Sequence, residues 1–135
     1  MKKLIFIDAG VLIAAARGND EIAEKAMEIL DNPEVSFGSS IFVKLEVLPK
    51  PLYHKKKLEV MFYESFFDSV SIWAEPSPKL IQNAYEEAIN LGLSAIDALH
   101  VSAAASIGAD EFVTSEGFTR PIHRTRILPI RTIAL

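Results

Sequence analysis

The sequence predicts an α/β protein with a mostly parallel central sheet and helices on both of its faces. The first observation is that short, β-rich apolar runs alternate with longer helix-like segments, as in β-α-β units. The second is that the first strand-like run is continuously apolar, which is typical of a strand covered on both faces. With 135 residues, no internal repeat and no linker, residues 1–135 are expected to form a single domain.

Each predicted strand is a short β-rich stretch bounded by turn-forming or charged residues. The first stops at Ala9 and Gly10, and the fourth has the sequence EFVTS. The last contains Pro129, which cannot donate to a ladder and therefore favours the edge of a sheet. In chain order, strands are predicted at residues 3–8, 34–38, 70–74, 111–115 and 126–133.

Capping and helix-breaking residues bound the predicted helices. The second helix is capped at its N-terminus by Ser39 or Ser40, and Pro49 and Pro51 end it. Pro78 opens the fourth helix and Gly92 closes it. The first and third helices are supported by apolar stripes at helical spacing. In chain order, helices are predicted at residues 19–32, 39–48, 55–69, 77–92 and 94–108.

Composition excludes several kinds of site and indicates a globular chain. The sequence has no cysteine, which rules out disulfides, thiolate nucleophiles and zinc–thiolate centres. A net charge of -4 argues against a surface that is basic all over. The N-terminal apolar run carries an aspartate and is too short to span a bilayer, so neither a signal peptide nor a membrane anchor is expected. The expected location is the cytoplasm, with no membrane contact.

Four carboxylates stand in apolar surroundings. Asp8 ends the first apolar run, and Asp97 is the only charged residue in a stretch of 22 residues. Glu46 falls between two apolar residues on a helical wheel, and Glu116 follows the strand EFVT. Because working sites of parallel sheets lie at the carboxyl ends of strands, we expect these acids to gather there. Clustered carboxylates repel unless cations compensate, and oxygen-only ligands select Mg²⁺ or Mn²⁺.

Each acid also has a purely structural interpretation. Asp8 is placed to cap a helix beginning near residue 11, and Asp97 lies three residues after Ser94, as in a capping box. The other two acids fit an exposed helical strip and a turn. His100, one turn after Asp97, is expected to be a core residue. The joint pattern of four acids favours the metal site.

Four segments, in this order, resemble the PIN-domain family: LIFIDAGVLIAA, SIFVKLEVL, LSAIDALHVSAAASIGAD and FVTSEGF. The resemblance covers essentially the whole chain and is strongest to the VapC-like toxin ribonucleases of toxin–antitoxin pairs. It implies a three-layer α/β/α fold, a Mg²⁺ or Mn²⁺ cofactor, and hydrolysis of phosphodiester bonds in single-stranded or structured RNA. It also implies an antitoxin protein as partner, and a homodimer.

The resemblance assigns roles residue by residue. Asp8, Glu46 and Asp97 match the acidic metal-binding positions of the family. Glu116 stands where the family usually has Asp, and Gly10 stands where Asn, Ser or Thr is common. All four acids are therefore the predicted catalytic and metal-binding residues. The two departures leave open an alternative, a non-catalytic or weakly active PIN-like module that binds RNA or a protein.

Substrate contacts are predicted around the last acid. Thr114 and Ser115 precede it and are expected to position water. Arg120, Arg124 and Arg126 follow it and are expected to bind RNA phosphates or an acidic partner peptide, with a solvated basic rim as the alternative. An exposed part of the predicted helix 55–69 would suit an antitoxin helix or a second subunit.

Two other classes of protein place an aspartate at the end of a first strand. A phosphoacceptor domain of the receiver type usually has neighbouring acids just after its first strand, and here the strand is preceded by Lys2 and Lys3. A haloacid-dehalogenase-like phosphatase would need a second aspartate at position 10, which is glycine. The sequence therefore favours a nuclease over both.

Overall fold

The computed structural model describes residues 2–134 and contains one five-stranded sheet in which every strand pair is parallel. The spatial order of the strands is β3-β2-β1-β4-β5. Their bounds are β1 Lys3–Ile7, β2 Val35–Ser39, β3 Ile72–Trp73, β4 Glu111–Thr114 and β5 Ile130–Thr132. The predicted fold class is confirmed, and the segment containing Pro129 leads into an edge strand as expected.

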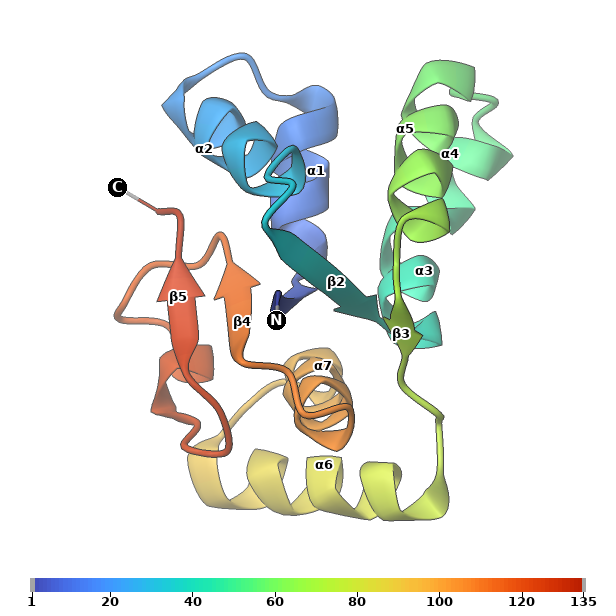
Figure 1. Cartoon of the computed structure of the whole chain (residues 1–135). Helices are drawn as coiled ribbons and strands as arrows, with labels where there is room; N and C mark the ends of the chain where they lie inside the picture. The colour runs from blue at the N-terminus through green and yellow to red at the C-terminus, as the bar shows by residue number, and fades with distance from the viewer. Residues whose placement is uncertain (1, 135) are drawn as a thin grey trace.

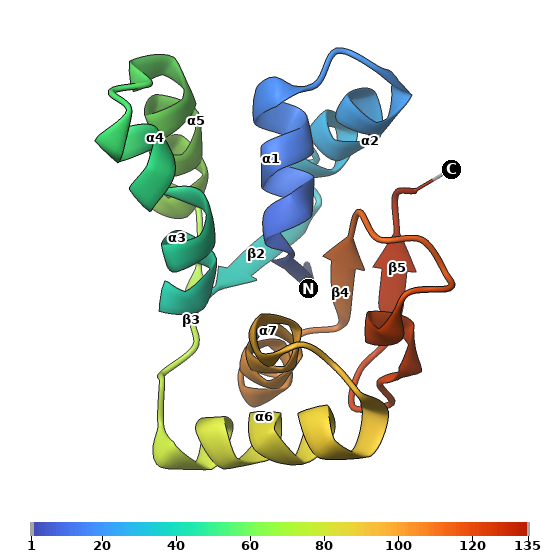
Figure 2. The same cartoon turned by 180° about the vertical axis from the view of Figure 1, so that it is seen from behind.

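Helices cover both faces of this sheet and complete the three layers. In Figure 1, α1 and α2 lie on one side of the sheet and α6 and α7 on the other, while α3, α4 and α5 flank the edge near β3. Figure 2 shows the same arrangement from behind. The bounds are α1 Ala9–Arg17, α2 Glu21–Leu30, α3 Ile41–Val47, α4 Pro49–Tyr53, α5 Lys57–Asp68, α6 Pro78–Leu91, α7 Ala95–Ser106 and the 3₁₀ helix η1 Pro121–Arg124. Across residues 2–134, no helix has the length and apolar character that a membrane crossing requires.

Three helical elements were not among the predicted ones. α1 begins directly after Asp8, which caps it, so the helix considered there as an alternative is present although it had no predicted bounds. α4 begins at Pro49, because a proline in the first helical turn lacks only an N–H that has no intrahelical partner there. η1 lies in the segment between β4 and β5. These additions leave the order of the predicted strands unchanged.

The order of the strands fixes where a site can form. From β1 the chain continues outward through β2 and β3, and then returns to place β4 and β5 on the other side of β1. The reversal therefore lies between β1 and β4, the point of an open parallel sheet where ligands usually bind. Phe6 of β1 stacks on Phe112 of β4, with ring centroids 5.6 Å apart, and both rings are fully buried. This packing gives the carboxyl ends of the two strands a rigid base.

Candidate metal centre

Asp8 lies at the switch point of the sheet and is held on both sides. Its backbone N–H donates to the carbonyl of Val113 at 2.9 Å, which joins the end of β1 to β4. Its side chain is buried, and Oδ1 accepts from the N–H of Ala9 at 2.8 Å as the N-cap of α1. Oδ2 accepts from the hydroxyl of Thr114 at 2.8 Å. The capping role and a role in a metal site are therefore compatible, since each carboxylate oxygen has a second lone pair.

The end of β4 orients Glu116 through the same threonine. Thr114 Oγ1 accepts a hydrogen bond from the N–H of Glu116 at 3.1 Å, and the hydroxyl of Thr114 donates one to Asp8 Oδ2. The carbonyl of Glu116 accepts from Thr132 Oγ1 at 2.6 Å and from His123 Nε2 at 2.9 Å. The backbone of Glu116 is thus fixed at three points. The hydroxyl of Thr114 therefore binds two carboxylate-bearing residues, which helps to position both of them.

Glu46 enters the site from α3 through a contact with α7. His100 Nε2 donates to Glu46 Oε1 at 2.7 Å, and the same nitrogen lies 4.0 Å from Asp8 Oδ1. The His100 ring is fully buried, as expected of a core residue, but it also connects two of the predicted metal ligands. The sequence shows only that His100 follows Asp97 by three residues and so shares its helix face, whereas the contact with Glu46 depends on the fold.

Asp97 lies in the first turn of α7. Its backbone N–H donates to Ser94 Oγ at 3.2 Å, and a hydrogen bond with the Ser94 side chain also lowers the pKa of its carboxyl. Burial raises the pKa of Asp97 above its usual value, and His100 opposes that rise. Nearby Glu46 adds a smaller upward contribution to the pKa. The capping interpretation therefore accounts for the contacts of Asp97 with Ser94, and the influence of Glu46 shows that the same carboxyl also lies near another acid.

The four acids share one electrostatic environment. Burial raises the pKa of Asp8 to about 6, with His100 and the Thr114 hydrogen bond opposing it and two acids adding to it. Burial also raises the pKa of Glu116, and the next largest contribution comes from Asp97. Charges that act on one another in this way lie close together. The structure thus brings all four predicted site residues into one region, from α3, α7 and the ends of β1 and β4.

The side chains do not form a finished ion site. Between residues 2 and 134, no three acidic or histidine side chains converge closely enough to enclose an ion. The cause is visible at Glu46, whose carboxylate is turned to His100, and in the repulsion among the acids. Glu116 Oε2 is buried and has no hydrogen-bond partner, which favours a cation as the missing partner. This orphaned oxygen and an oxygen-only ligand set fit Mg²⁺ or Mn²⁺.

Ser115 explains the glycine at position 10. A Cβ atom built on Gly10 would lie 2.2 Å from Ser115 Oγ, well inside van der Waals contact. The hydroxyl of Ser115 therefore occupies the space into which a side chain at position 10 would project. A hydroxyl is thus present beside the start of α1, although it comes from the residue after β4 and not from the position that the family pattern uses.

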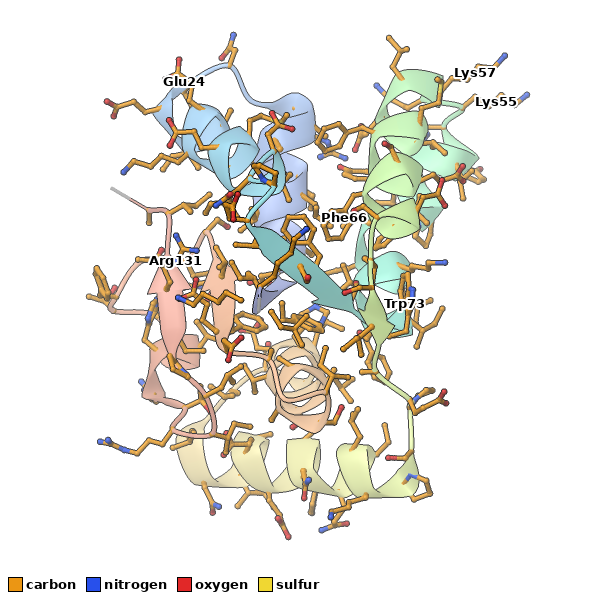
Figure 3. The ribbon with its side chains drawn as sticks, viewed as in Figure 1. Glu24, Lys55, Lys57, Phe66, Trp73 and Arg131 are labelled. Carbon is orange, nitrogen blue, oxygen red and sulfur yellow. The ribbon has the colours of Figure 1, made fainter. Side chains whose placement is uncertain are left out.

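The basic residues separate into different environments. The charge of Arg120 acts on both Asp97 and Glu116, so this arginine borders the acids. Arg124 donates from Nη1 to the carbonyl of Leu91 at 2.9 Å and so closes the end of α6. Arg126 is exposed, with no contact that connects it to the acids in the described part of the chain. Figure 3 shows the lysines at 55 and 57 pointing outward at the far end of the α4–α5 pair, as a solvated group.

His100→Leu should separate packing from metal binding. Leucine has a similar volume, so the loss of stability should be about 1 kcal/mol, because half-exposed Glu46 can turn to water. Mg²⁺ affinity should rise by up to about tenfold, since Glu46 no longer has to give up its hydrogen bond to His100 before it reaches the ion. Thermal melts over a Mg²⁺ titration measure both quantities. An unchanged Mg²⁺ midpoint would limit His100 to a packing role.

Comparison with known proteins agrees with this arrangement. A sequence profile of the PIN domain matches residues 5–119. A search of curated protein sequences finds no significant match. Several solved structures share the fold, with sequence identities that carry no argument beyond the fold itself. One is VapBC2 from Rickettsia felis bound to a DNA fragment from its promoter, with a TM-score of 0.72 and 17% identity over 96% of this chain and 98% of that chain. Another is DNA-bound VapBC from Salmonella typhimurium, with a TM-score of 0.66 and 15% identity over 99% of this chain and 100% of that chain. A third is FitAcB from Neisseria gonorrhoeae, with a TM-score of 0.61 and 15% identity over 96% of this chain and 97% of that chain.

Proposed function

The chain belongs to the PIN-domain family, and on this basis we propose that it is a Mg²⁺- or Mn²⁺-dependent endoribonuclease, the toxin of a toxin–antitoxin pair acting in the cytoplasm. PIN domains are generally nucleases that use divalent metals. The observation that carries the proposal is the group of four mutually interacting carboxylates at the switch point of the sheet. A structural role alone does not account for gathering four acids in one place, because their repulsion is unfavourable.

The residues fit the proposed ion. Asp8, Glu46 and Asp97 would hold it, and Glu116 would complete the set with its buried, partnerless oxygen. A bound Mg²⁺ or Mn²⁺ supplies positive charge for a phosphate and lowers the pKa of water. Metal binding would require Glu46 to turn from His100, a change that a half-exposed side chain on α3 permits.

The chain's own groups account for positioning. Thr114 fixes the orientation of Asp8, and the hydroxyl of Ser115 beside Gly10 is placed to hold a water or a phosphate oxygen. Arg120 provides a positive charge next to the acids, which offsets the charge of an approaching phosphate. Hydrolysis by in-line attack of water on the phosphate needs no covalent nucleophile from the protein.

An antitoxin protein and a second copy of the chain are the proposed partners. The support is the fold shared with the VapBC structures, together with exposed apolar side chains on two parts of the surface. On α4 and α5 these are Leu52, Tyr53, Leu58 and Met61, and on α6 they are Ile81, Tyr85 and Ile89. Surface apolar groups of this extent suit protein contacts better than water.

Purified protein incubated with a labelled single-stranded RNA tests the activity. Cleavage should require Mg²⁺ or Mn²⁺, stop with chelator, and return when metal is restored. The alternative function, an inactive module that binds RNA or protein, is favoured by one observation, the engagement of Glu46 by His100. Binding of RNA without cleavage at any concentration of either metal would establish that alternative.

Arg120 should make an RNA phosphate contact that Arg124 does not make. Arg120→Gln is expected to lower the slope of log affinity against log salt by about 0.7, the value for one lost contact to a single strand. Arg124→Gln is the matched control, because its guanidinium serves the end of α6. Fluorescence anisotropy at several salt concentrations measures both slopes. If the two variants have the same slope of log affinity against log salt, Arg120 does not make a phosphate contact of its own.

A further inference from the structure

An exposed aromatic ring borders the carboxylates. The chain has eight phenylalanines, and Phe118 is the one that lies mostly in water, with 78% of its surface exposed. It follows Glu116 by two residues, in the segment between β4 and η1 (Figure 1). A single exposed apolar side chain is common on protein surfaces. The surroundings of Phe118 are what distinguish it.

The ring of Phe118 is supported from within the site. Its centroid lies 5.1 Å from that of the His123 ring, with the planes tilted by 45°. His123 Nε2 donates to the carbonyl of Glu116, the same carbonyl that accepts from Thr132. The two rings are therefore connected to the backbone group that carries the fourth carboxylate. Contact with an anchored ring restricts the orientations open to Phe118, which lowers the entropy cost of binding a ligand.

Positive charge lies on the same short segment. The N–H of Arg120 donates to the carbonyl of Gly117 at 3.0 Å, which closes a turn around Phe118. The charge of Arg120 lowers the pKa of both Asp97 and Glu116, so this arginine lies near the acids. An aromatic face beside a cation is the combination that binds single-stranded nucleic acid, through stacking on a base and contact with a phosphate.

We propose that Phe118, supported by His123, stacks on an unpaired base of an RNA strand whose phosphate lies at the carboxylates. The inference rests on the proposed ribonuclease function and narrows its substrate to RNA with an unstacked base beside the reacting bond. Double-stranded RNA does not offer such a face, because its bases stack on one another. A protein partner is less supported here, since the neighbours Thr119 and Arg120 are exposed and polar, whereas a stable protein interface needs an apolar centre.

RNA binding by the full-length chain tests the stack. Affinity is measured by anisotropy in the Asp97→Asn background, so that RNA stays intact, with a single-stranded oligoribonucleotide and its duplex form. Phe118→Ala should weaken single-strand binding about tenfold. Phe118→Leu should lose nearly as much, and Phe118→Tyr should restore binding. The matched control is Tyr53→Ala on α4, an aromatic residue of 81% exposure that should leave affinity unchanged.

An abasic oligonucleotide separates stacking from general loss of contact. A series of oligonucleotides carries one abasic nucleotide, placed at a different position in each. One member of the series should bind the protein with Phe118 about tenfold more weakly than the intact oligonucleotide does, and Phe118→Ala should weaken its binding no further. Equal affinities of Phe118→Leu and the parent, or an equal loss in duplex binding, would overturn the stack while leaving the ribonuclease proposal intact. Binding and stacking without any cleavage by wild type would instead overturn the ribonuclease proposal alone. If Phe118→Ala elutes at a different volume in size-exclusion chromatography but binds RNA as tightly as its parent, the ring belongs to a contact between two copies of the chain, and the inference is overturned.

Discussion

Replacing Asp97 by asparagine should abolish RNA cleavage, lowering the rate by about a hundredfold or more. Asparagine keeps the size of the side chain and the backbone N–H that Ser94 caps, so α7 should form as before. What is lost is one negative charge from the group of four acids, and with it affinity for a divalent cation. Asp8→Asn should have the same effect, because it removes a charge from the same group of acids; its amide oxygen can still accept from Ala9, whereas the hydrogen bond with Thr114 would have to reverse its direction.

Two further variants make this result specific. Glu116→Gln should reduce cleavage less, since Glu116 is expected to support the ion rather than hold it. Glu64→Gln, an exposed acid on α5, should cleave at the wild-type rate. Initial rates on one labelled RNA, at matched metal concentration, compare all variants. Asp97→Asn with wild-type activity would show that the acids are not the reaction centre.

The second large effect concerns stability without metal, and its sign follows from the raised pKa of Asp8. The carboxyl titrates near 3.8 in the unfolded chain and at about 6 in the folded chain. Between these values the folded state binds more protons, so metal-free wild type should lose stability as the pH rises from about 4 to about 6. Above about pH 6 this loss of stability is complete. Asp8→Asn should not show the loss, because its amide does not ionise.

The expected gain is limited by the new amide. A shift of this size corresponds to about 3 kcal/mol at most, and placing the amide beside Thr114 should reduce the benefit to about 1–2 kcal/mol. In chelator near neutral pH, Asp8→Asn should therefore melt above wild type. Mg²⁺ should reverse the order, since a hundredfold excess over Kd adds about 2.7 kcal/mol to wild type and little to the variant.

A cap elsewhere in the chain provides the control for this comparison. Asp20 caps α2 by accepting from the N–H of Ala23 at 3.0 Å, and its carboxylate is not one of the four predicted metal ligands. Asp20→Asn should melt close to wild type and keep the full response to Mg²⁺, because Asn and Asp cap equally well. If Asp8→Asn is simply less stable in chelator at every pH, then Asp8 is a structural cap only.

The strands could be predicted from sequence because their signals are local. Each is a short apolar run with a clear end, and all five occur in the structure. α1 was expected only as a helix that Asp8 could cap, without predicted bounds, because AGVLIAAAR is apolar nearly all round and shows no helical period. Such a helix is covered on several sides, and α1 packs against α2, α3, α5 and β4. The neighbouring amphipathic helices show apolar residues at helical spacing, whereas a helix that is buried on most sides shows no such spacing.

The site was predictable only in part, for a similar reason. Asp8 and Asp97 are visible as charges in apolar sequence, and the strand ends indicate where they lie. The contacts that orient them are tertiary: Thr114 reaches Asp8 across 106 positions, and His100 reaches Glu46 across 54. No local pattern predicts such pairs. The hydroxyl of Ser115 in the space beside Gly10 likewise depends on how two strand ends meet.

The central claim is that these four carboxylates together bind one or more divalent ions. The most direct measurement is a titration of the purified wild type and Asp97→Asn with Mn²⁺, with the fraction of free ion read by electron paramagnetic resonance. The account predicts a saturable Mn²⁺ site in wild type that Mg²⁺ displaces and that Asp97→Asn binds at least tenfold more weakly, about 1.4 kcal/mol in binding free energy. Wild type and variant that bind Mn²⁺ equally, or wild type that binds none at millimolar concentration, would contradict it.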